Sequence, residues 1–274
     1  MNIHVTGIGV SAPGLADWPA TRAVLRGEVV YVHSDWRAGS RSPLIGPERR
    51  RATAVTSLAL EAAMEAAGPD RAQWDIPSVF ASSGGEVDVC DRIFAQLAQP
   101  ERAVSPTQFH NSVHNAASGY WSIAAGSHRP ATSIACFDDS FAAGLVEAAA
   151  LLAVEPGELL LVAYDQPPPF PIAPFRPLSG PFAVGLRLTS NAATAPALAS
   201  LQIGYVEARS ALPASMSMVP LEAMRAGNPA ARSLPLLAAI ACEQPALIHL
   251  NCAGPGLLRV AVSAKPWNAA NSDA

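Results

Sequence analysis

The sequence predicts an α/β fold, in which strands and helices alternate around a largely buried sheet. The first observation is the order of segments within residues 3–165, which runs strand, helix, strand, helix, helix, strand, helix, strand. The second is composition, since 50% of the 274 residues are hydrophobic and only 15% are charged. That balance supplies a core and excludes a disordered, highly charged chain.

Charge and cysteine usage narrow the class of protein further. Lys and Arg total 18 and Asp and Glu total 22, so the net charge of −4 argues against general nucleic-acid binding. Cys90, Cys136, Cys242 and Cys252 form no CxxC pair, and we interpret them as reduced thiols. The start of the sequence has no signal-peptide pattern, and no apolar run approaches the ~18 residues of a membrane span. We therefore expect a soluble, cytoplasmic protein without a transmembrane segment.

The first elements are predicted from short apolar runs and from the glycine and proline residues that end them. Residues 3–10, IHVTGIGV, are apolar and β-branched, which is typical of a buried strand. Residues 48–67 predict a helix with three arginines, residues 49–51, in its opening turns, where the helix dipole favours acids. We interpret the arginines as a solvated basic face, with a functional role as the alternative. Residues 77–83 predict a second strand, which ends at two glycines, and residues 86–98 predict a helix.

The later elements include one unusually apolar helix. A loosely amphipathic helix is expected over 110–125 and a short strand over 130–135. Residues 141–153 carry a single charge, Glu147, so this helix should lie inside the protein. The remaining expected elements are strands at 158–165, 182–189, 199–208 and 256–263, and a helix near 233–242.

Two short motifs suggest a cofactor or a metal site, but neither has the residue pattern that such a site requires. The segment GIGVSAPG lacks the G-x-G-x-x-G spacing of a dinucleotide loop, and no phosphate loop is present. His110 and His114 are four residues apart, but the text HNSVH lacks the glutamate of a zinc helix and a third ligand. We therefore expect neither a cofactor nor a metal site.

The segment IACFDDSF is the most informative candidate for chemistry. Cys136 ends a strand close to a helix start, where a thiol can become a nucleophile. Asp138 and Asp139 follow almost at once, and two nearby carboxylates disfavour the thiolate. The same carboxylates suit the helix N-terminus, where a cap contributes ~0.5–2 kcal/mol. We therefore expect Asp138 to cap the helix that begins near Ser140.

Five segments, taken in order, resemble the N-terminal half of a β-ketoacyl synthase. They are VTGIGVSAPG, GPERRRATAVTSLALEAAMEAA, SVFASSGGEVD, the long run from SPTQFHNSVHNAASGYW to the strand PATSIA, and CFDDSFAAGLVEAAALLA. The resemblance implies a thiolase-type, layered α/β sandwich built from two similar halves. Residues 1–165 would form a complete N-terminal half, and residues 166–274 a truncated second half of the same compact unit.

The departures from the family pattern suggest a subunit without catalytic activity. Alignment of the apolar helix places Asp138 where the synthases carry the catalytic cysteine, and Cys136 falls two residues early. The second half contains one histidine, His249, whereas the family uses two histidines, or a histidine and an asparagine. The pattern resembles chain length factors, most of all the truncated factors of aryl polyene-type pathways. The resemblance implies a heterodimer with a catalytic synthase, whose acyl tunnel this chain shapes, and an acyl carrier protein that acts through the complex.

The resemblance also suggests which residues meet the partner. In the family the strand before the nucleophile pairs across the dimer axis, and here that strand is PATSIA. Preceding it are candidate interface and tunnel residues, Phe109, His110, His114, Tyr120 and Trp121, although core packing is an alternative for Trp121. Two other functions remain open. One is a stand-alone acyltransferase or thioesterase using Cys136, and the other is a homodimeric acyl-binding scaffold.

Overall fold

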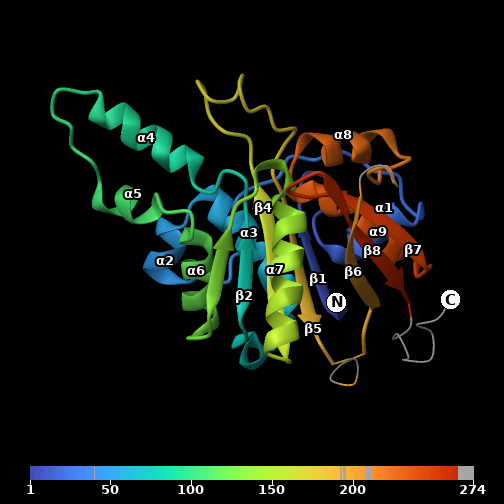
Figure 1. Ribbon diagram of the computed structural model, residues 1–274. Helices are drawn as coiled ribbons and strands as arrows, with labels where there is room; N and C mark the ends of the chain where they lie inside the picture. The colour runs from blue at the N-terminus through green and yellow to red at the C-terminus, as the bar shows by residue number, and fades with distance from the viewer. Residues whose placement is uncertain (40, 192, 194–195, 208–210, 265–274) are drawn as a thin grey trace.

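The computed structural model describes residues 1–39, 41–191, 193, 196–207 and 211–264. Within these residues, the strands form one mixed sheet of eight with the order β3-β2-β4-β5-β1-β6-β8-β7 (Figure 1). The strands are β1 (Asn2–Ser11), β2 (Ser78–Ala81), β3 (Ala131–Ile134), β4 (Glu158–Asp165), β5 (Phe182–Thr189), β6 (Ala199–Glu207), β7 (Ala246–Asn251) and β8 (Gly256–Ser263). The predicted α/β class is confirmed.

Helices cover both faces of the sheet. They are α1 (Trp18–Leu25), α2 (Gly46–Arg51), α3 (Ala54–Ala67), α4 (Val87–Leu97), α5 (Pro106–Asn111), α6 (Ala116–Ala125), α7 (Ser140–Val154), α8 (Val219–Gly227) and α9 (Leu234–Cys242). Helices α3 and α6 pack on one face with the apolar cluster that contains Leu58, Phe80 and Trp121. Helix α7 packs on β2 and β4 from the other face, with the cluster that contains Leu145 and Leu161.

Strand direction brings the loops of interest together at one edge of the sheet. Strand β2 lies between β3 and β4 and runs parallel to both, whereas β5 and β1 are antiparallel to their neighbours. The carboxyl ends of three parallel strands therefore open at the same edge. In open α/β sheets, this is the edge at which ligands bind.

The helix expected over 48–67 consists of two helices. Ala52 is extended, with φ −61° and ψ 136°, and ends α2. Thr53 then begins α3, because its hydroxyl accepts a hydrogen bond from the amide of Thr56 at 3.1 Å. The three arginines consequently stand in the last turn of α2, where the dipole favours cations, rather than in the opening turns of a long helix. All three are exposed, as the solvated interpretation expects.

The helix expected over 110–125 is also divided. Helix α5 ends at Asn111 and α6 begins at Ala116, so His110 and His114 do not share one helix face. The Asn111 side chain joins the two pieces, since it donates to the carbonyl of Arg51 at 2.7 Å and accepts from the Tyr120 hydroxyl at 3.0 Å. Helices α1 and α8 and strand β7 were not expected, and residue 208 of the expected strand 199–208 lies outside the described residues.

Helix α7 departs from the expectation that it lies wholly inside the protein. Its inner face is packed closely, because a Cβ on Gly144 would come within 2.9 Å of Ala81 and 3.0 Å of Leu161. Its outer face carries Val146 and Val154, which are 36% and 80% exposed. In Figure 1 no other element covers α7 on the side toward the viewer. The apolar composition of this helix therefore does not translate into complete burial.

Candidate functional site

The turn between β3 and α7 has the backbone geometry of a sharp elbow. Phe137 has a φ of 50°, a left-handed conformation that is strained for a large side chain. Ser140 closes the turn, since its Oγ accepts from the amide of Cys136 at 3.0 Å and donates to the carbonyl of Phe137 at 2.7 Å. The short 3-10 helix Phe137–Asp139 is thereby fixed at the carboxyl end of the parallel strands.

Two arginines from the part of the chain after residue 165 hold the acids of this turn. Asp138 forms ion pairs with Arg176 at 2.5 Å and with Arg232 at 3.1 Å, and Arg232 also pairs with Asp139 at 2.8 Å. The guanidinium of Arg176 lies over the ring of Phe137, 3.9 Å from its centroid. The predicted capping role of Asp138 is wrong, because no side chain caps α7 among the described residues. Two cations attract the carboxylate more strongly than backbone N–H groups do.

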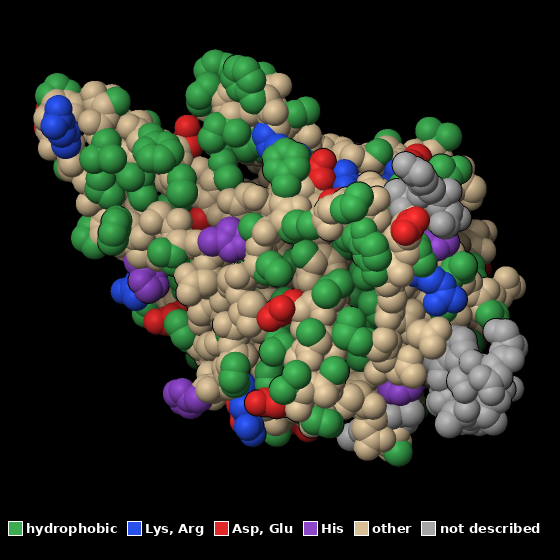
Figure 2. Space-filling model, viewed as in Figure 1, with side chains coloured by type: hydrophobic (Ala, Val, Ile, Leu, Met, Phe, Trp, Pro, Cys, Tyr) green, Lys and Arg blue, Asp and Glu red, His purple; other side chains and the backbone are tan. Residues whose placement is uncertain are grey.

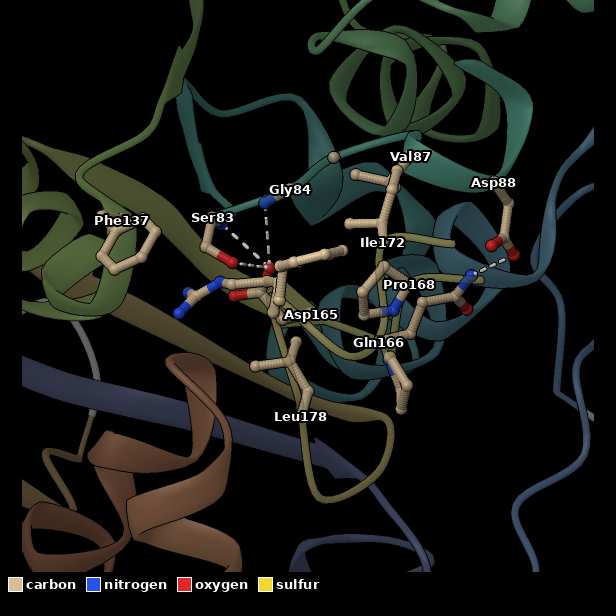
Figure 3. A pocket seen from close by; sticks show the side chains of 14 residues that line it. Ser83, Gly84, Val87, Asp88, Phe137, Asp165, Gln166, Pro168, Ile172 and Leu178 are labelled. Carbon is tan, nitrogen blue, oxygen red and sulfur yellow. Dashed lines mark hydrogen bonds between the residues drawn. The ribbon is translucent and has the colours of Figure 1, made fainter. Parts of the chain in front are cut away.

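A cavity of about 320 Å³ lies beside the elbow, between the loops that follow β2 and β4 (Figure 3). Its apolar walls include Val87, Phe137, Ile172 and Leu178, and the glycine loop Ser83–Gly85 forms another side. At the rim, the Gln166 side chain donates to Asp88 at 2.7 Å and so ties the loop after β4 to α4. The cavity therefore has both apolar and polar walls, and Asp165 and Arg176 are among the residues that line it.

Asp165 is a deeply buried acidic group at this edge, with 2% of its surface exposed. Its Oδ1 accepts hydrogen bonds from the hydroxyls of Ser82 and Ser83, at 3.0 and 2.7 Å, and from the amides of Ser83 and Gly84, at 2.9 and 3.2 Å. Burial nevertheless raises its pKa to about 6. Asp165 thus joins the end of β4 to the loop that follows β2, as the dashed lines in Figure 3 indicate.

Sequence reasoning missed Asp165, Arg176 and Arg232. A signal for Asp165 was present, since this aspartate ends an apolar strand and Ser82–Gly85 follows the neighbouring parallel strand. Parallel strands bring such ends together. No comparable signal exists for the two arginines, because their contacts with Asp138 join residues 38 and 94 positions apart, 176 − 138 and 232 − 138.

The expected interface residues separate into two groups. Tyr120 and Trp121 are 4% and 1% exposed, and Trp121 stacks on Trp74 with ring centroids 5.1 Å apart. These two side chains therefore pack in the core of this chain, which is the alternative left open for Trp121, and an interface or tunnel role for them stays a prediction. Phe109 is 70% exposed on α5 and His110 beside it is exposed as well. His114 is half-buried, and its Nε2 forms a hydrogen bond with the carbonyl of Ser82 at 3.0 Å.

Cys136 stays half-buried at the start of the turn and does not line the cavity. The residues that the structure describes contain no group of three or more histidine, cysteine or acidic side chains that could hold a metal ion. In the same part of the chain, no helix has the length and apolar character needed to cross a membrane.

Comparison with known proteins gives a family and a set of similar folds. Residues 42–246 match the family described as beta-ketoacyl synthase, N-terminal domain, and no curated protein matches the sequence. A chain of the ketosynthase ApeO in complex with its chain length factor ApeC, from Xenorhabdus doucetiae, is 22% identical, with a TM-score of 0.71 over 95% of this chain and 99% of that one.

Two further solved structures have the same TM-score of 0.71, and in each the match covers 96% of this chain and 99% of the other. One is the ishigamide ketosynthase/chain length factor, which is 16% identical. The other, 14% identical, is AntDE:AntF, described as a type II PKS acyl-carrier protein in complex with its ketosynthase bound to the hexaketide. These likenesses confirm the layered, thiolase-like fold. Because the family match spans well over half of the 274 residues, the chain belongs to the β-ketoacyl synthase family.

Proposed function

We propose that this chain is a chain length factor, a subunit without catalytic activity that pairs with a catalytic β-ketoacyl synthase. In the proposed complex it shapes the acyl tunnel of the synthase during polyene, polyketide or fatty-acid-like biosynthesis in the cytoplasm. The acyl carrier protein acts through the complex. The observation that carries the proposal is the pair of ion pairs at the elbow, in which Asp138 contacts Arg176 and Arg232.

The absence of catalysis follows from what a condensing enzyme needs. The reaction requires a nucleophile that carries the acyl group and donors for the developing oxyanion. The position aligned with the catalytic cysteine is Asp138, a carboxylate already engaged by two cations. Among the described residues that line the neighbouring cavity there is neither a cysteine nor a histidine. This arrangement supports a partner role rather than a catalytic one.

The surface around β3 supports pairing with another subunit. Strand β3 is paired only with β2 in the described sheet, so its outer edge offers free N–H and C=O groups. Next to it, the arm built from α4, α5 and the turn after them exposes Phe94, Leu97, Phe109 and Val113. Figure 2 shows hydrophobic side chains gathered over this arm at the upper left. An apolar surface of this kind is typical of an interaction site.

The pairing is tested by co-expression with a β-ketoacyl synthase of the same organism, followed by size-exclusion chromatography and sedimentation. The expected result is a one-to-one complex that survives purification. A chain that remains monomeric beside equimolar synthase would contradict the proposal. A chain that forms a stable homodimer and ignores the synthase would favour the acyl-binding scaffold instead.

The alternative of a stand-alone acyltransferase or thioesterase depends on Cys136. Iodoacetamide labelling of the folded protein near neutral pH, read by mass spectrometry, distinguishes the two functions. As a subunit without catalytic activity, the chain should label Cys136 no faster than the exposed Cys242. Selective, rapid labelling of Cys136 would support the acyl-transfer alternative.

A further inference from the structure

The outer face of α7 is an apolar helix surface that nothing in the described chain covers. Val146, Leu151 and Val154 are 36%, 37% and 80% exposed, and Ala150 between them is exposed as well. The side chains over this helix in Figure 2 are mostly hydrophobic. Glu147 is the single charged residue of the helix. Fully apolar helices belong in protein interiors, so this face indicates a missing neighbour.

A groove runs along the C-terminal part of this face. Its cavity measures about 430 Å³ and lies between α7 and the starts of β2, β3 and β4. The floor is apolar, with Ala150, Leu151 and Val154 among its residues. The groove is therefore large enough to receive several side chains of a helix or loop, and its floor is chemically suited to them.

The charges of the groove all have one sign. The charged residues that line it are Glu147, Glu155 and Glu158, and no lysine or arginine is among its described lining residues. Glu158 is paired with Arg187 at 2.8 Å. Glu147 and Glu155 form no ion pair within the described residues. An occupant that buries the apolar floor would thus complete the site with a cation placed beside Glu147 or Glu155.

The groove is continuous with the free edge of the sheet. Thr132 of β3 lines it, and β3 is the strand proposed to meet the partner. A second copy of this chain is a poor occupant, because a two-fold contact through this face would bring the acids of one copy toward those of the other. Like charges brought together at an interface cost binding free energy.

We propose that this groove receives an apolar helix or loop of the partner synthase that carries a lysine or arginine opposite Glu147. The proposal rests on the proposed function and adds to it a second contact, on the face of the sheet that α7 covers. The edge of β3 supplies backbone pairing, and the groove supplies charge recognition. The acidic groove thereby selects a synthase over a second copy of the chain.

The test measures the dissociation constant of the complex with the co-expressed synthase for Glu147→Lys and Glu147→Gln. Charge reversal places two cations together and should weaken binding at least tenfold. Neutralisation should weaken it less and should reduce the dependence of binding on salt. Asp35→Lys is the matched control, because Asp35 is 94% exposed, does not line the groove, and undergoes the same charge change. The control should bind like the unmodified chain.

A steric variant keeps the test independent of charge. Ala150→Trp fills the groove from an exposed position, so it should fold normally, as judged by melting temperature, and lose affinity for the synthase. Unchanged affinity in both Glu147→Lys and Ala150→Trp would overturn the groove as a docking site while leaving the pairing intact. A homodimer of the unmodified chain that Ala150→Trp disrupts would identify a second copy as the occupant and also overturn the proposal. An unmodified chain that never binds the synthase would instead refute the proposed function.

Discussion

At the scale of single residues, the two aspartates at the carboxyl edge of the sheet have opposite surroundings. Asp138 is 36% exposed and faces two guanidinium groups. Asp165 is buried, and its partners are neutral hydroxyl and amide groups of the loop that follows β2. The first carboxylate therefore has two cations as partners, whereas burial raises the pKa of the second and disfavours its charge.

Asp165 should make the stability of the protein depend on pH. Its pKa is raised from 3.8 to about 6, so the folded state holds the proton more tightly than the unfolded state does. The stabilisation from this group is complete below about pH 4 and is lost as the pH rises through 6, by about 3 kcal/mol. Urea unfolding of Asp165→Asn should show a weaker decline over this range than the unmodified chain. Identical pH profiles would contradict the assignment.

Asp138 and Arg176 should show coupled effects on stability. Because the pair is partly exposed, a double-mutant cycle with Asp138→Ala and Arg176→Ala should give a coupling free energy of ~0.2–1 kcal/mol. The same cycle with Asp138→Ala and Arg22→Ala is the control, since Arg22 pairs with Glu243 elsewhere. Chemical denaturation measures both cycles. A coupling of zero for the first pair would indicate that the ion pair contributes nothing in solution.

At the scale of elements, the strands other than β7 were predictable, whereas the breaks between helices were not. Runs such as 159–164 are continuously apolar because both faces of the sheet are covered, and composition alone reveals them. The pattern of residues 48–67 is helical throughout, yet Thr53 interrupts it by capping α3. The burial of Trp121 against Trp74 depends on a contact 47 residues away, 121 − 74, which local periodicity does not encode.

The free edge of β3 should be essential for pairing and dispensable for folding. The amides of Ser78 and Ser82 donate to the carbonyls of residues 130 and 134, so in this parallel register the amide of Ala131 points away from β2. Ala131→Pro should therefore leave the melting temperature nearly unchanged and abolish or greatly weaken the complex with the synthase. Ala131→Val, which keeps the amide, is the control. Retention of the complex by the proline variant would argue against pairing through this edge.

Phe109 on α5 should affect the product and not the fold. Since the side chain is 70% exposed, Phe109→Ala should change the melting temperature little, whereas the length distribution of products made with the synthase should shift. Tyr120→Ala gives the contrast, because loss of a core aromatic costs ~3–5 kcal/mol of stability. Mass spectrometry of the products provides the measurement. An unchanged distribution for Phe109→Ala would remove this residue from the tunnel while leaving the pairing intact.

At the scale of the whole molecule, the site joins regions that are distant in sequence. The elbow belongs to the first 165 residues, and its two cations come from the residues that follow. The sheet likewise continues from β1 directly into β6, so the described strands form one unit. The resemblance of five short segments was enough to predict this family and fold. The expected division of the chain into an N-terminal half, residues 1–165, and a truncated second half, residues 166–274, stays a prediction.

The purified chain should have no condensing or decarboxylating activity of its own. The reason is the absence of a thiol at the aligned position and of a histidine around the cavity among its described lining residues. Turnover of a malonyl-carrier substrate, followed by carbon dioxide release, measures this for the chain alone and with the synthase. Activity should appear only when the synthase is present. Turnover by the chain alone would refute the absence of catalysis.

The two arginines at the elbow bear on what a cysteine at position 138 could do. Asp138→Cys would remove the carboxylate that pairs with Arg176 and Arg232, and would leave a thiol beside both guanidinium groups, of which Arg232 keeps its ion pair with Asp139. Such a thiol would ionise readily, yet a deprotonated sulfur held by guanidinium groups is a weaker nucleophile. No histidine is among the described residues that line the neighbouring cavity. Under the proposed function, conversion to a catalyst would thus need several simultaneous substitutions. The ion pairs that fix the elbow are among the contacts that such a conversion would have to replace.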